Sequence, residues 1–159
     1  MKLSELMAKK TPLTTYTGVV TDDDFVLAVA ADAESDTPAD YLVVQEHIEK
    51  HEAGVNSSSK DTKYIRSGSN TLKNGFQRSF NISGTRYIGD EFQDMCCSNA
   101  VKFGTGKAVE RNYVYFCLLT GKGEKGRVAI LTNNDQGSDA AISVELKGCG
   151  APEDYTYSA

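Results

Sequence analysis

Apolar positions along this chain recur mainly at every second residue, which is the spacing of half-buried β-strands. In "GFQRSFNIS", for example, Phe76, Phe80 and Ile82 fall on one face and polar residues fall on the other. The dipeptide Asn74-Gly75 is a strong hairpin signal, so it predicts a turn between two of these segments. The predicted strands cover residues 15–20, 24–32, 41–49, 63–72, 75–83, 107–120, 127–133 and 140–148.

One segment, about 90–101, has helical spacing instead. Phe92, Met95 and Cys96 follow the 3, 4 periodicity of one helix face, which we expect to pack on the sheet. Asp90 stands where a helix cap belongs, and Glu91 and Asp94 suit the positive end of the helix dipole. Near the N-terminus, "SELMAKK" is interpreted either as the start of a short helix with Ser4 as its cap or as a loose arm.

The stretch at 50–62 is almost free of apolar residues. A polar segment of this length is uncommon in a compact domain unless it binds something or is disordered. We predict a long exposed loop at 50–62.

These elements fit a single domain over residues 1–159, with residues 1–15 as an N-terminal arm and 151–159 as a polar C-terminal tail. No internal repeat and no linker divides the chain. The predicted class is mainly β (α+β), a β-sandwich or open barrel with one packed helix at about 90–101.

Composition narrows the classes of function. The net charge of −5 gives no overall basic surface for holding nucleic acid. The N-terminus lacks the apolar region of a signal peptide, and no apolar run is long enough to span a membrane, so we expect a protein made in the cytoplasm without a membrane anchor. None of the four cysteines forms a C-x-x-C, and reduced thiols buried as small apolar groups are the default.

Candidate chemistry is weak at each place where it could occur. "HIEKH" holds two histidines four apart, but the local pattern is strand and a third ligand is not evident nearby, so no metal site is predicted. "TGKGEKG" lacks the G-K-[ST] element of a phosphate loop and reads as a turn. The carboxylates of "RYIGDEFQDMCC" suit the first turns of a helix. We therefore expect no catalytic residues, no cofactor and no metal, and a protein that is not an enzyme.

Several motifs together resemble those of a known family. They are "KYIRSG" at 63–68, "RYIGDEFQD" at 86–94, "YVYF" at 113–116 followed by "LTGKGEKG", and the terminal "EDYTY". In these the chain resembles the major tail proteins, or tail tube proteins, of long-tailed phages and prophages of Gram-positive bacteria. The resemblance covers roughly two thirds of the chain, from residue 60 to 157.

The resemblance implies a structural subunit of the virion tail. Such subunits form hexameric rings that stack into a hollow tube, which is assembled around a tape-measure protein between a tail initiator or baseplate and a tail terminator. Phage DNA passes through the tube without specific binding. The loop at 50–62 corresponds in position to the extended loop that such proteins use against the next ring. The resemblance therefore implies six candidate contacts between rings, which are His51, Glu52, Asn56, Ser58, Lys60 and Asp61.

Two alternatives stay open at the level of sequence. The tube of a contractile tail, or of a phage-tail-like bacteriocin, shares the same fold. From another class, a monomeric β-sandwich binding module is an alternative that would require an exposed aromatic platform. Tyr113 and Tyr115 share one strand face, and the other tyrosines are scattered.

Overall fold

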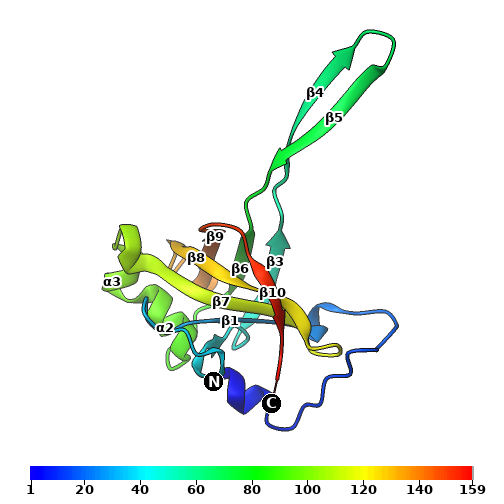
Figure 1. Cartoon of the computed structure of the whole chain (residues 1–159). Helices are drawn as coiled ribbons and strands as arrows, with labels where there is room; N and C mark the ends of the chain where they lie inside the picture. Colours follow the sequence, from blue (N-terminus) through cyan, green and yellow to red (C-terminus); the bar gives the residue numbers. More distant parts are fainter. Residues whose placement is uncertain (159) are drawn as a thin grey trace.

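A curled antiparallel sheet dominates the fold, as the computed structural model shows for residues 1–158 (Figure 1). The protein is therefore mainly β, as the sequence predicts. The strands are β1 (Phe25–Val29), β2 (Leu42–Val43), β3 (Ile48–Gly54), β4 (Ser58–Tyr64), β5 (Gly68–Gly75), β6 (Ser79–Thr85), β7 (Glu110–Cys117), β8 (Lys122–Asn134), β9 (Ala141–Gly148) and β10 (Glu153–Thr156). The helices are α1 (Leu3–Met7), α2 (Glu91–Cys97) and α3 (Asn99–Lys102), with 3₁₀ turns at Asp22–Asp24, Pro38–Asp40, Gly106–Val109 and Ser138–Ala140.

The main sheet runs in the order β2-β1-β7-β8-β9-β6-β3, and β10 pairs with part of β8. All its pairings are antiparallel, for example Tyr113 opposite Gly126 and Phe80 opposite Leu146. Its first and last strands, β2 and β3, are neighbours in sequence. The sheet therefore curls until its two ends are joined by the short segment 44–47.

Both faces of the central strands β1 and β7 are covered by side chains. The inner face forms the larger core, where Leu27 and Tyr113 meet Phe80 and Ile130 beneath α2. The outer face forms a second core against α1 and the C-terminal segment, where Val26 and Phe116 lie with other apolar side chains. Strands buried on both faces read as continuous apolar runs, which explains why "FVLAV" and "YVYFC" were predictable. The second core also contains Leu3, Met7, Tyr41 and Val43, with Tyr155 and Tyr157 packed against it.

The predicted helix at about 90–101 is confirmed in place but consists of two short helices. Phe92 and Cys96 are buried in the larger core and Met95 packs against it, as predicted. The break falls at Ser98, whose backbone is extended and whose Oγ donates to the carbonyl of Met95 at 2.7 Å. A serine that bonds the preceding turn competes with the helical ladder, so α2 ends there and α3 begins.

Two predictions for the middle of the chain are wrong. Residues 50–62 are not a long loop, because 50–54 lie in β3 and 58–62 lie in β4. The hairpin turn does not lie at Asn74-Gly75, because β5 runs through both residues and the chain reverses at Ile65–Ser67 instead. The two strands pair continuously, from Ser59 opposite Lys73 to Tyr64 opposite Gly68, and this pairing places the turn at the far end.

Predictions for the two ends of the chain are also modified. The predicted strand at 15–20 is an unpaired segment. In the arm at 1–15, α1 is buried through Leu3 and Met7, and its N-cap is Lys2, not Ser4. In the tail at 151–159, β10 pairs with β8, while residue 159 lies outside the described residues.

Asp90 caps α2, as predicted, since its carboxylate accepts a hydrogen bond from the amide of Gln93 at 3.1 Å. Asp90 is buried, and desolvation raises its pKa above the ordinary 3.8. The folded protein therefore holds this proton to a higher pH than the unfolded chain does.

We predict that Asp90→Ala lowers the free energy of unfolding by about 1 kcal/mol, because an amide of α2 loses its acceptor. Asp90→Asn keeps an oxygen acceptor without a buried charge, so it should cost less. The stability of the wild type relative to Asp90→Asn should fall as the pH rises from 3.8 through the raised pKa. Urea denaturation over a pH series measures both effects, and a difference that does not vary with pH would contradict this account.

Candidate functional site

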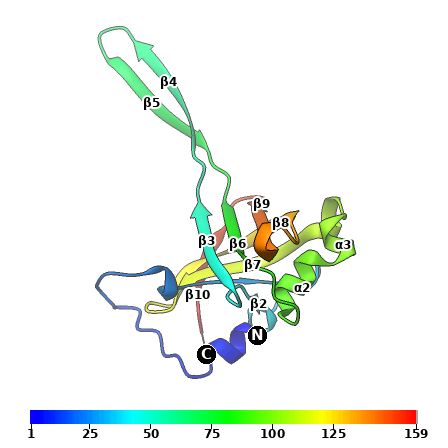
Figure 2. The same ribbon diagram turned by 180° about the vertical axis from the view of Figure 1, so that it is seen from behind.

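The hairpin formed by β4 and β5 is the most exposed feature of the molecule. It projects away from the curled sheet in both views (Figures 1 and 2). Its two strands pair only with each other and form a sheet of their own. A two-stranded ribbon without a third strand or a helix to pack on is marginally stable in water, so this hairpin gains most from a partner.

Large apolar side chains of the hairpin face solvent. Tyr64 is 58% exposed, Ile65 is 87% exposed and Leu72 is 67% exposed. Tyr64 and Ile65 lie at the tip, in the "KYIRSG" motif, where Arg66 has a positive φ of 65°. Exposed Tyr, Ile and Arg side chains on one tip are typical of a contact surface.

The base of the hairpin is fixed to the body by side-chain contacts. Arg78 forms an ion pair of 2.6 Å with Glu124 of β8, and its guanidinium lies 4.8 Å from the centre of the Phe80 ring. Glu124 also accepts a hydrogen bond from the Tyr113 hydroxyl at 2.8 Å. On the other side Asn56 donates to the Ser79 hydroxyl at 2.7 Å. The hairpin therefore leaves the body at a defined place.

The six predicted contact residues do not lie on one loop. His51 and Glu52 belong to β3 on the body, and the His51 ring is partly buried, 6.1 Å from the Tyr115 ring. Asn56 serves the base of the hairpin. The other three, Ser58, Lys60 and Asp61, lie along β4 and are exposed. The hairpin thus brings together half of the set and adds the tip, which the loop prediction missed.

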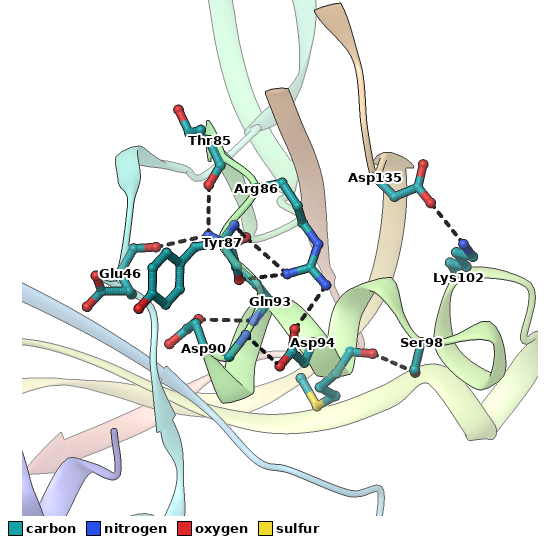
Figure 3. A network of polar contacts seen from close by, with 12 residues as sticks. Glu46, Thr85, Arg86, Tyr87, Asp90, Gln93, Asp94, Ser98, Lys102 and Asp135 are labelled. Carbon is teal, nitrogen blue, oxygen red and sulfur yellow. Dashed lines mark hydrogen bonds and ion pairs between the residues drawn. The ribbon is translucent and has the colours of Figure 1, made fainter. Parts of the chain in front are cut away.

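A buried polar network lies where α2 meets the turn between β2 and β3 (Figure 3). At its centre is Gln93, which is fully buried. Its amide nitrogen donates to the carbonyls of Glu46 at 2.9 Å and Thr85 at 3.1 Å, and its amide oxygen accepts from the backbone N–H of Tyr87 at 2.8 Å. One side chain therefore joins the β2–β3 turn, the end of β6 and the loop before α2.

Arg86 and Asp94 extend this network toward the surface. Arg86 donates to an Asp94 oxygen at 2.9 Å and to the Tyr87 carbonyl at 2.8 Å. The second Asp94 oxygen accepts the backbone N–H of Gly89 at 3.1 Å. Two of the three carboxylates of "RYIGDEFQDMCC" are thus occupied locally, Asp90 as the cap of α2 and Asp94 in holding the preceding loop to the helix. They are arranged as structural acceptors.

The turn that Gln93 holds is itself strained. His47 has a positive φ of 56°, which costs a non-glycine residue on the order of 1 kcal/mol. Its ring stacks on Tyr87 with centroids 4.5 Å apart, and its carbonyl accepts from Thr85 at 2.9 Å. Gly84 lies directly beside the backbone of His47, where a side chain would collide. These contacts maintain the turn between the two ends of the sheet.

The thiols have surroundings that do not favour nucleophilic chemistry. All four cysteines are unpaired, and burial raises the pKa of Cys96 and, less strongly, of Cys97. A thiolate is the reactive form, so both thiols are held in the unreactive state.

Within residues 1–158, no group of three or more His, Cys, Asp or Glu side chains is arranged to hold a metal ion. Of the helices in the same part of the chain, none has the length and apolar character needed to cross a membrane.

The chain matches no protein-family model, and a search of curated proteins finds no similar sequence.

We predict that Gln93→Ala lowers the free energy of unfolding by about 3 kcal/mol, because two carbonyls and one N–H lose their buried partner. Chemical denaturation of the purified protein measures this loss. Gln77→Ala is the matched control, since Gln77 is exposed and its side chain makes no hydrogen bond within residues 1–158. It should change stability by less than about 0.5 kcal/mol. Equal effects of the two substitutions would contradict the role of Gln93.

Proposed function

We propose that this protein is a structural subunit of a phage tail tube, which assembles into stacked hexameric rings around a central channel and performs no catalysis. The β4–β5 hairpin carries this proposal. It stands apart from a well-packed body and exposes apolar and basic side chains at its tip, which is what a connector between subunits requires.

The family resemblance supports the same function through particular places in the fold. "KYIRSG" forms the end of β4 and the tip of the hairpin, and "RYIGDEFQD" forms the Gln93 network and the start of α2. "YVYF" lies in the central strand β7, and "EDYT" is β10. The motifs thus coincide with the hairpin tip, the segment that holds the β2–β3 turn through Gln93, the central strand β7, and β10.

The free edge of the sheet also favours assembly. β3 pairs with β6 on one side, and within residues 1–158 its other side has no strand partner. Exposed Glu49, Lys50 and Glu52 lie along β3. Charged residues on an edge strand discourage indiscriminate pairing. This edge therefore favours association with a partner strand that carries complementary charges, as in ring closure.

The partners follow from the proposal. The protein would bind copies of itself, a tape-measure protein in the lumen, and the tail initiator or baseplate and tail terminator at the ends of the tube. Phage DNA would pass through without specific contacts, and the site of action would be the virion tail. The tube of a contractile tail or of a phage-tail-like bacteriocin is the same proposal with a sheath added.

The binding-module alternative has less support. Tyr113 is buried and Tyr115 faces the larger core, where both rings contact Phe80. The exposed tyrosines Tyr16, Tyr64 and Tyr87 lie on different segments: the N-terminal segment before β1, the hairpin, and the loop before α2. An aromatic platform for a carbohydrate needs neighbouring exposed rings, and residues 1–158 do not provide one.

We predict that the purified protein at high concentration forms rings or tubes with a central channel in negative-stain electron microscopy. A variant in which Ser58–Gly75 is replaced by an Asn-Gly turn should remain folded but form no tubes. Its free energy of unfolding should change by less than about 1 kcal/mol, because the hairpin packs on nothing else and loop length affects closure entropy only slowly.

The outcomes separate the alternatives. Normal tubes from the deletion variant would show that the hairpin has no role in assembly. A wild-type protein that stays monomeric at every concentration, even with the tail initiator present, would contradict the proposal and favour a binding module.

A further inference from the structure

Charge is divided sharply between the hairpin and the rest of the molecule. The segment Ser58–Gly75 holds four cations and one carboxylate, so its net charge is +3 within a chain of −5. The remainder, with 13 cations and 21 carboxylates, has a net charge of −8. The four cations are exposed, and none forms an ion pair within residues 1–158; they are Lys60, Lys63, Arg66 and Lys73.

A groove of about 470 Å³ lies on the body between β1 and β2 on one side and β3 on the other. Phe25, Val43 and Tyr115 are among the apolar side chains that line it. The size is within the range of about 300–1,000 Å³ that suits a small ligand or a few inserted side chains. The groove is where the curled sheet fails to close.

Carboxylates stand around this groove. Asp22 and Asp23 lie on one side and Glu49 on the other, and all three are exposed. None of them forms a salt bridge within the described part of the chain, whereas Glu52 lies 3.7 Å from Lys50. Lys10 and Lys50 also line the groove, but the carboxylates outnumber the lysines there, so the groove combines apolar side chains with an excess of negative charge.

The hairpin tip has the complementary composition. Tyr64 and Ile65 supply exposed apolar side chains, and Lys63 and Arg66 flank them with positive charge. Strands of this length extend roughly 20–25 Å, and both views show the tip pointing away from the body of its own subunit (Figures 1 and 2). A tip held in this way can reach the groove of another copy but not its own.

We propose that the hairpin tip Lys63–Arg66 of one copy docks in the groove between β1 and β3 of a second copy. Tyr64 and Ile65 cover the apolar lining, while Lys63 and Arg66 neutralise Asp22 and Asp23. The contact is heterologous, so each copy offers one tip and one groove. Repetition of this contact alone builds a closed ring or an open filament, and together with a separate contact within rings it joins one ring to the next. This inference rests on the proposed self-assembly and names the surface that receives the hairpin.

Duplex DNA is the competing ligand for a basic ribbon with an apolar tip, since wedge residues on such arms enter the minor groove. The charge of the body favours a protein partner. With −8 outside the hairpin, the rest of the subunit repels a phosphate backbone. The same charge attracts the hairpin of a second copy.

Charge reversal tests the contact in the full-length protein. Lys63→Glu/Arg66→Glu and Asp22→Lys/Asp23→Lys should each weaken self-association on the order of 100-fold in sedimentation velocity, because like charges then meet in the interface. In a mixture, the acidic tip of the first variant meets the basic groove of the second, and the basic tip of the second meets the acidic groove of the first. The mixture should therefore associate although neither variant does alone. Added salt should weaken the wild-type association.

Matched controls carry the same changes of charge on exposed residues elsewhere. Lys9→Glu/Lys107→Glu and Glu34→Lys/Glu153→Lys should associate like the wild type. The unfolding midpoint of each variant is measured, and only variants whose midpoint matches that of the wild type are compared. A loss of folding is then not mistaken for a loss of contact. If the remote pairs weaken association as much as the tip and groove pairs do, net charge alone is responsible and the inference is wrong.

The remaining outcomes distinguish this inference from the proposed function. Tubes that form normally with reversed tip or groove charges overturn the inference and leave the tail-tube proposal standing. Tip-dependent association without rings or tubes supports the inference and contradicts the proposal. A wild type that never self-associates contradicts both. A tip variant that loses binding to a DNA duplex while self-association is unchanged would assign the hairpin to DNA.

Discussion

The fold depends on one buried side-chain amide, that of Gln93, which holds the turn where the two ends of the sheet meet. A single-path sheet with β2 and β3 at its edges curls only if the segment between them stays in place. That segment includes His47 in a strained backbone conformation, which persists only if surrounding contacts hold it in place. The fully buried side chain of Gln93 donates two hydrogen bonds to carbonyls and accepts one from a backbone N–H, and leaving a polar group unpaired at such a position is costly. The direction of β3, and hence of the hairpin that continues it, follows from this turn.

With increasing distance from this turn, the strands have fewer buried contacts and fewer strand partners within the chain. β6 and β9 are buried in the larger core, β3 has one free side, and β4 and β5 have only each other. Stability follows the same gradient, since elements with few buried contacts open most easily. The division of charge runs along it as well, from an acidic body to a basic tip. Within residues 1–158, one ribbon and one groove have no partner although the rest of the chain is well packed, and binding between copies of the chain would cover both.

The sequence predicts the elements whose burial produces a recognisable apolar pattern, either a periodic one or a continuous apolar run. β1, β7, β8, β9 and α2 fall in this group, together with the packing of Phe92, Met95 and Cys96. The prediction from sequence fails for Ser58–Gly75. A ribbon that is exposed on all sides shows no alternation of apolar and polar residues, and its Ser, Thr, Asn and Lys residues are typical of a loop. Asn74-Gly75 misleads because the long ladder from β4 to β5 outweighs a local turn preference. Residues 15–20 mislead in the opposite direction, since β-branched residues there have no strand beside them. The role of Gln93 could not be predicted, because three of its partners are backbone groups at residues 46, 85 and 87 that only the folded chain brings together.

The central claim is that the hairpin is supported by other subunits and not by its own. Hydrogen exchange of the backbone amides, measured at a dilution where the protein is monomeric and again after concentration, tests it most directly. We expect the amides of β6–β9 to be protected in both samples, while those of Ser58–Gly75 exchange rapidly in the monomer and become protected on association. Hairpin amides that are as protected in the monomer as those of the core, with no change on concentration, would contradict the account.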